Sequence, residues 1–206
     1  MPQGACHPMD RDQVGAPPAA PESQDAAAAD TGSFYVFGYG SLIWNPGFPY
    51  DSRHLALVRG LHRRFCLWSH RYRGTPERPG LVLGLDRGGS CMGVAHRVPI
   101  EARGEVLDYL DERELPDGSE QVYDRRAVRL TLADQDHRPA TAITYVARRA
   151  CRMYCGPLAL EDAARTIAAA AGQTGTNRDY LANTVAHLRE FGVRDRALER
   201  IHALVG

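Results

Sequence analysis

The chain has 206 residues, a length that fits one domain or one domain with tails. Apolar residues make up 44% and charged residues 24%, a balance that excludes a wholly disordered chain. The 25 basic residues, all Arg, match 25 acidic ones. The absence of Lys excludes Schiff-base and Walker-type Lys chemistry, and the net charge of zero disfavours a nucleic-acid partner. No apolar run approaches the ~20 residues that cross a bilayer, so we expect no membrane partner.

Residues 1–33 differ from the rest in composition. They contain five Pro and eight Ala but no aromatic residue, and five acidic residues against one Arg. Such a segment buries too little apolar surface to offset its ordering entropy. We therefore predict a disordered acidic tail over 1–33 and a single domain over 34–206.

The five cysteines are odd in number and scattered along the chain. In a chain of this size, this usage is typical of reduced thiols in a cytoplasmic protein. Cys151 and Cys155 are close in sequence, but no nearby His or Cys pair completes a set of zinc ligands. We expect a cytoplasmic protein without a metal.

The hydrophobic pattern after residue 33 predicts strands first and helices last. Short strands are expected over 34–39, 54–60, 63–68, 81–86, 91–98, 123–132 and 140–147, with RGGS (87–90) as a turn. Helices are expected over 100–114, 157–172 and 177–192, with Asn177 as a cap, followed by a short one ending at Val205. This order predicts an α+β fold, in which about seven short strands form a small β-barrel flanked by helices.

The first candidate site is the glycine-rich segment Gly38-Tyr39-Gly40-Ser41-Leu42-Ile43, which follows the first strand. Glycines allow successive backbone N–H groups to point into one concavity, where they bind an anion or a developing oxyanion. The same pattern is compatible with a tight turn by which the chain leaves the sheet. It is not a dinucleotide fingerprint, because it lacks a third Gly and no helical pattern follows.

The second candidate is Glu114. At 100° per residue it falls on the apolar stripe of Val106, Leu107 and Leu110, whereas Glu105, Asp108 and Glu112 project to the opposite side. A carboxylate against apolar surface has a raised pKa, as a general base near neutral pH requires. The helix could instead fray before Pro116, which would leave Glu114 in water or paired with an Arg.

Arginines and tyrosines supply weaker candidates. Arg73 precedes Gly-Thr-Pro, so its guanidinium could grip a carboxylate from an ordered turn, although a solvated Arg is the more common case. Tyr123 and Tyr154 could hydrogen-bond a substrate, although packing is the more common role of Tyr.

Five segments follow one another along residues 34–190: FYVFGYGSLIWNPGFPY, RGTPERPG, YLDERE, YCGPLALEDAA and GTNRDYL. Together and in this order, they resemble the ChaC family of γ-glutamylcyclotransferases. The resemblance implies a small cyclotransferase barrel flanked by helices. It implies that glutathione is cleaved to 5-oxoproline and cysteinylglycine without metal or cofactor. It places the family's substrate loop on residues 38–43 and its catalytic glutamate on Glu114. LPDGSEQV, between Glu114 and Tyr123, is a few residues longer than in relatives.

The expected reaction is attack of the substrate's own α-amine on its γ-carbonyl, so no protein nucleophile is required. Two alternatives stay open. The chain could act on another γ-glutamyl-amine or γ-glutamyl-amino acid, or it could be a non-catalytic binding module on the same fold. The sequence does not indicate an oligomeric state.

Overall fold

The computed structural model describes residues 32–114 and 121–206. The predicted tail over 1–33 therefore lies outside the described residues except for Gly32 and Ser33, and most of LPDGSEQV lies outside them as well. No helix of the described ranges is both long and apolar enough to span a bilayer.

Five strands form a closed barrel in the order β1-β3-β2-β4-β5. Their bounds are β1 Ser33–Gly38, β2 Ser52–Ser69, β3 Gly80–Pro99, β4 Tyr123–Leu132 and β5 Arg138–Ala147. Neighbours are antiparallel, except that β1 runs parallel to β5 and closes the barrel. The predicted α+β barrel is confirmed.

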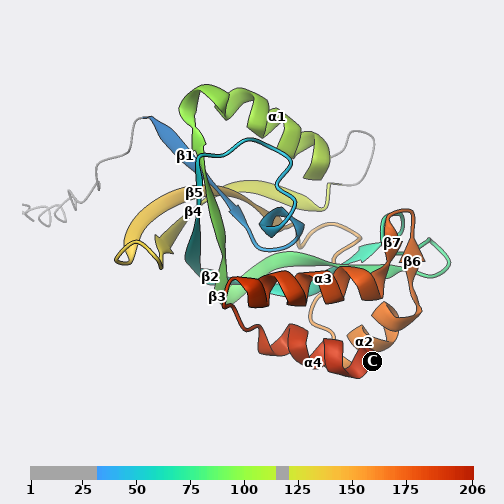
Figure 1. The fold of residues 1–206 in the computed structure, drawn as a ribbon. Helices are drawn as coiled ribbons and strands as arrows, with labels where there is room; N and C mark the ends of the chain where they lie inside the picture. Colours follow the sequence, from blue (N-terminus) through green and yellow to red (C-terminus); the bar gives the residue numbers. More distant parts are fainter. Residues whose placement is uncertain (1–31, 115–120) are drawn as a thin grey trace, which may run out of the picture.

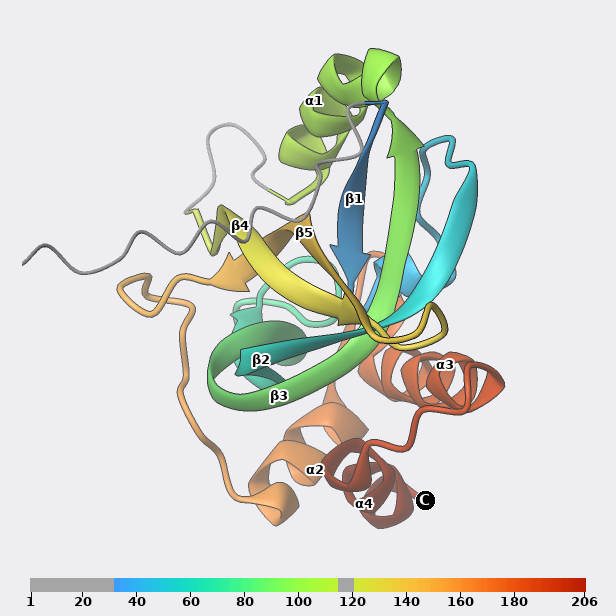
Figure 2. The same cartoon turned by 90° about the vertical axis from the view of Figure 1, so that its left-hand side faces the viewer.

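The strands are fewer and longer than predicted. The expected strands 54–60 and 63–68 are both part of β2, and 81–86 and 91–98 are both part of β3, so RGGS is not a turn. Gly60, at φ 81°, faces Gly88 and Gly89, at φ 97° and 65°, where the pairing of β2 with β3 shifts register. The glycines thus bend the paired strands (Figure 2) and do not end them.

Helices cover two opposite ends of the barrel (Figures 1 and 2). At one end lies α1 (Arg103–Glu114), preceded by the short 3-10 helix η2 (Ile100–Ala102), which together match the predicted helix 100–114. At the other end lie α2 (Leu160–Ala169), α3 (Asn177–Glu190) and α4 (Arg196–Val205).

The ends of α2 and α3 differ from the prediction. α2 begins at Leu160 rather than Pro157, and it ends at Ala169 because the next residues form a small ladder, β6 (Ala171–Gly172) with β7 (Gly175–Thr176). The Thr176 hydroxyl caps α3 by accepting from the Asp179 N–H, so Asn177 is not the cap. The Asn177 amide is fully buried and instead bonds both backbone groups of Leu81 on β3.

Two apolar clusters hold these layers together. One joins the barrel to α2–α4 through residues such as Leu83, Ile167, Leu181 and Leu188. The other joins the barrel to α1 through Val36, Leu67, Val106 and Leu110. Each fully buried aliphatic side chain contributes ~1.5–3 kcal/mol to the free energy of unfolding. Both clusters therefore hold their helices against the barrel.

Candidate functional site

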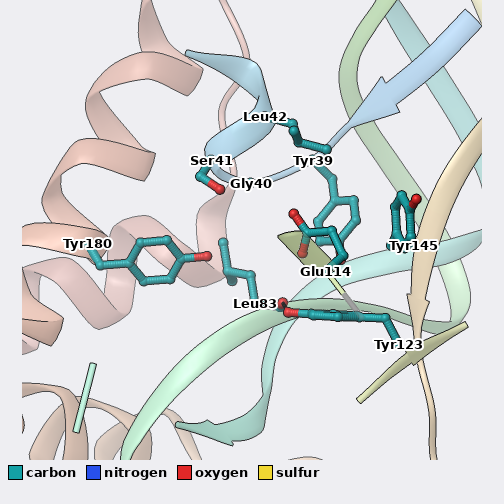
Figure 3. A pocket seen from close by; sticks show the side chains of 9 residues that line it. All are labelled: Tyr39, Gly40, Ser41, Leu42, Leu83, Glu114, Tyr123, Tyr145 and Tyr180. Carbon is teal, nitrogen blue, oxygen red and sulfur yellow. Dashed lines mark hydrogen bonds between the residues drawn. The ribbon is translucent and has the colours of Figure 1, made fainter. Parts of the chain in front are cut away.

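A pocket opens where β1 leaves the barrel (Figure 3). The space between its lining residues is about 330 Å³, open solvent at its mouth included. Its lining residues are Tyr39, Gly40, Ser41, Leu42, Leu83, Glu114, Tyr123, Tyr145 and Tyr180. The chain therefore brings together the segment after β1, the end of α1, strands β3, β4 and β5, and α3.

The glycine-rich segment continues from β1 into the short 3-10 helix η1 (Ser41–Ile43). A Cβ on Gly38 would lie 2.9 Å from the Leu42 Cβ, so only Gly allows this return of the chain. The Ile43 N–H donates to the Gly40 carbonyl over 2.9 Å, and Leu42 and Ile43 are buried. Gly38 and Ile43 are thus structural supports that do not line the pocket.

Successive backbone N–H groups remain available at the start of η1. Within residues 32–114 and 121–206, no acceptor bonds the N–H of Gly40, Ser41 or Leu42. These residues line the pocket, and Figure 3 shows Glu114 on the facing side of the same space. Unpartnered donors opposite a carboxylate are suited to a substrate that develops negative charge on an oxygen.

Glu114 is the last residue of α1. The helix continues to Glu114, with Val106, Leu107 and Leu110 buried on the same stripe. The side chain of Glu114 is only 18% exposed, and its Oε1 lies 3.2 Å from Nε of Arg113. Burial raises the pKa of the carboxyl, and the Arg113 guanidinium partly offsets this rise. Two of the predicted environments, apolar contact and pairing with an Arg, thus occur together.

Four tyrosines surround the carboxylate. The Tyr123 hydroxyl donates to the Leu83 carbonyl over 2.8 Å, and the Tyr145 hydroxyl donates to Asp111 Oδ1 over 2.6 Å. Burial raises the pKa of Tyr39 and Tyr123 well above its usual range and that of Tyr180 to about 12. These phenols therefore stay protonated at physiological pH and act as neutral hydrogen-bonding groups.

Arg73 and Tyr154 do not line the pocket. The Arg73 guanidinium lies 5.0 Å from the ring centroid of Tyr180 and donates to the Thr174 carbonyl over 2.7 Å, so it contacts one lining residue. The Tyr154 hydroxyl donates to Asp86, whose carboxylate also accepts from Arg149. Tyr154 therefore belongs to an ion cluster around the buried Asp86 carboxylate, outside this pocket.

The sequence does not predict Leu83, Tyr145 and Tyr180 as lining residues. Leu83 and Tyr145 lie inside apolar strand patterns, and Tyr180 lies on the apolar side of α3, so each matches an ordinary core residue. The pairing of distant strands brings them to the pocket, and local spacing does not reveal it.

Known proteins resemble this chain in a family model, in sequence and in structure. The family model for ChaC-like proteins matches residues 34–206. The glutathione-specific γ-glutamylcyclotransferase 1 of Rattus norvegicus is 36% identical over 195 residues, which cover 93% of this chain and 85% of the relative. The glutathione-specific γ-glutamylcyclotransferase of Escherichia coli is 35% identical over 173 residues, which cover 84% of this chain and 73% of the relative.

A crystal structure of a yeast γ-glutamylcyclotransferase specific to glutathione superposes with a TM-score of 0.75. It shares 24% sequence identity and covers 84% of this chain and 96% of its own, which shows the common fold. With the family match over residues 34–206 and relatives above 30% identity, the chain belongs to the ChaC-like protein family.

Proposed function

We propose that this protein is a glutathione-specific γ-glutamylcyclotransferase that releases 5-oxoproline and cysteinylglycine. One observation carries the proposal: a partly buried carboxylate, Glu114, lines one pocket with Gly40, Ser41 and Leu42, whose N–H groups have no acceptor within the described residues. The names of the curated relatives support glutathione as the substrate.

The substrate supplies its own nucleophile. In a γ-glutamyl amide, attack of the α-amine on the γ-carbonyl closes a five-membered ring and expels the amine of the next residue. The protein must bind the substrate in a folded conformation that brings the amine and the carbonyl together. In a well-oriented intramolecular reaction, proximity lowers the activation free energy by up to ~7–11 kcal/mol. Leu83 and four tyrosines line the pocket in which the substrate would take this conformation.

Glu114 carries the protons. The carboxylate first accepts a proton from the α-ammonium group, which frees the nitrogen lone pair for attack. The protonated Glu114 then gives this proton to the departing nitrogen of cysteinylglycine, and the ring nitrogen loses its extra proton as the amide of 5-oxoproline forms. Such transfer contributes ~10²–10⁴-fold. Because burial raises the pKa of Glu114, its basicity is closer to that of the amine that it serves.

The N–H groups at the start of η1 stabilise the oxyanion. Attack converts the γ-carbonyl into a tetrahedral centre with a negative oxygen. Gly40, Ser41 and Leu42 line the pocket where it forms, and their N–H groups have no acceptor within residues 32–114 and 121–206. The loss of one such donor typically costs ~10²–10³-fold in rate. We assign Arg73 to a carboxylate of glutathione, because its guanidinium lies 5.0 Å from the ring of Tyr180, which lines the pocket.

We further propose that the reaction takes place in the cytoplasm. The four cysteines of residues 32–114 and 121–206 are all free thiols, which supports a reducing compartment.

A mass-spectrometric product assay tests the function. The purified protein is incubated with reduced glutathione, oxidised glutathione and two γ-glutamyl dipeptides, beside Glu114→Gln and Arg73→Ala. We expect 5-oxoproline with cysteinylglycine from reduced glutathione, a loss of at least ~10²-fold in Glu114→Gln, and a raised KM in Arg73→Ala.

Other results would change the proposal. Cyclisation of a dipeptide but not of glutathione would keep the mechanism and change the substrate. Binding of glutathione in calorimetry without any 5-oxoproline would favour a binding module. A near wild-type rate in Glu114→Gln would exclude Glu114 as the base.

A further inference from the structure

We propose that Arg113 is a positioning residue that holds the η1 loop and Glu114 in one arrangement. The inference rests on the proposed function and deepens it, because it concerns how the donors and the base are kept opposite one another.

The Arg113 guanidinium contacts both sides of the pocket. On its own helix, Nε lies 3.2 Å from Oε1 of Glu114. Across the gap, Nη2 donates to Oγ of Ser41 over 2.9 Å, and Nη1 donates to the Asn45 carbonyl over 2.8 Å. One rigid group thus joins the base to the segment that carries the oxyanion donors.

Further contacts fix the guanidinium. Nη1 also lies 3.3 Å from the Pro46 carbonyl and 3.1 Å from the Tyr109 hydroxyl, one turn earlier on α1. Gly47 follows at φ 76°, and a Cβ there would overlap the Tyr109 phenol, so the loop backbone packs directly on α1. The Arg113 side chain is 21% exposed, which shields these contacts from water.

An Arg is chemically suited to this position. Its planar guanidinium offers five N–H donors in a fixed geometry, whereas a Lys offers a single point charge on a flexible stem. Here three nitrogens serve three different parts of the site at once: Glu114, Ser41 and the carbonyls of the loop. A Lys at 113 would retain the charge beside Glu114 but could not satisfy all these acceptors.

The electrostatic role can be separated from the geometric one. The groups that interact electrostatically with Glu114 include Arg113 on α1, Tyr39 after β1, Tyr123 on β4, Tyr145 on β5 and Tyr180 on α3, and Asp111 lies three residues earlier on α1. The tyrosines stay neutral, and Asp111 is engaged by Tyr145 and Arg125. Removal of the Arg113 charge should therefore raise the pKa of Glu114 further, whereas a Lys should largely preserve it.

The test compares Arg113→Met, Arg113→Lys and the control Arg126→Met, whose exposed guanidinium pairs with Asp124 and does not line the pocket. We expect Arg113→Met to lower kcat ~10²-fold, as misplacement of reacting groups does. It should also shift the acid limb of the kcat/KM profile to higher pH. Arg113→Lys should keep the acid limb near that of wild type with an intermediate kcat, and Arg126→Met should change neither.

A second readout does not require turnover. NMR titration of the Glu114 carboxyl should give a higher pKa in Arg113→Met than in wild type and Arg113→Lys. If wild type fails to convert glutathione, the proposed function fails, and the titration still decides the effect of Arg113. An unchanged acid limb and unchanged Glu114 titration in folded Arg113→Met, or a kcat equal to that of the control, would overturn the inference.

Discussion

At the scale of single residues, Glu114 combines a cost in stability with a use in catalysis. Its carboxyl lies at the end of a helix that is otherwise apolar on this side, and it is more buried than the acidic residues on the outer side of α1. Burial disfavours the ionised form, and the neighbouring guanidinium of Arg113 only partly compensates. The proposed chemistry requires the ionised form, so the two demands conflict.

This conflict predicts a pH-dependent gain in stability for Glu114→Gln. Because the folded-state pKa is raised, ionisation destabilises the fold above that pKa, and the effect disappears as pH falls below the ordinary value of 4.5. We therefore expect urea unfolding to show the variant as more stable than wild type at pH 8 and equal at pH 4. Activity of wild type should fall on acidification through a pKa above 4.5. A variant that is less stable at pH 8 would contradict this account.

At the scale of elements, the η1 loop is fixed from two sides. From α1, Arg113 bonds Ser41 and the loop carbonyls. From β3, Nε2 of His96 lies 3.0 Å from the Leu42 carbonyl, in a fully buried ring that packs against Phe48 and Tyr50. The Leu42 carbonyl can only accept, so this geometry fixes the ring proton on Nε2.

The buried ring of His96 predicts an acid-sensitive loop. Burial lowers the pKa of His96 to about 4 from 6.5, so the unfolded chain binds the proton first. Stability from this residue is complete above pH 6.5 and is lost toward pH 4, by ~1.4 kcal/mol per pH unit at most. His96→Phe should unfold with a flatter pH dependence between pH 7 and 5. It should be ~1–3 kcal/mol less stable at pH 8, because the Leu42 carbonyl loses its donor.

The matched control is His202→Phe, at the end of α4 and away from the loop. Urea unfolding of the three proteins at pH 5, 6, 7 and 8 makes the comparison, because the other titrating groups cancel between them. An identical pH dependence in His96→Phe and wild type would show that His96 is not the acid-sensitive group.

At the scale of the whole molecule, the sequence predicts features that follow from local residue spacing. It does not predict features that depend on the pairing of distant strands. The apolar stripe of α1 correctly placed Glu114 on the inner side, and the glycine spacing correctly marked a special loop after β1. The sequence predicts RGGS (87–90) as a turn and ends a strand at Gly60, because a bulge and a turn share the same local chemistry. The substrate role of the pocket residues stays a prediction.

The residues that line the pocket also depend on the pairing of distant strands. Leu83 comes from β3, Tyr145 from β5 and Tyr180 from α3, and their positions follow from barrel closure. Nothing in the spacing of these three residues distinguishes them from core positions. Tyr154, in contrast, was singled out by its loop, yet the pairing of Leu67 with Tyr154 directs it to Asp86.

The boundary of the domain can be tested by truncation. The predicted boundary fell at residue 34, but the Gly32 carbonyl accepts from the Ile100 N–H over 3.1 Å, and Ser33 pairs with Pro99. We expect a 32–206 protein to match the full chain in kcat/KM and Tm, because the acidic residues of the tail are predicted to contribute no packing.

A 34–206 protein should differ, because it loses the first pair of the β1–β3 ladder and the bond to Ile100. Loss of about one hydrogen bond costs ~1 kcal/mol, which corresponds to ~2–4 °C in Tm for a chain of this size. Calorimetry and the product assay on the three proteins decide the boundary. A loss of activity already at 32–206 would mean that residues 1–31 contact the site, and a Tm for 34–206 equal to that of 32–206 would place the boundary at residue 34.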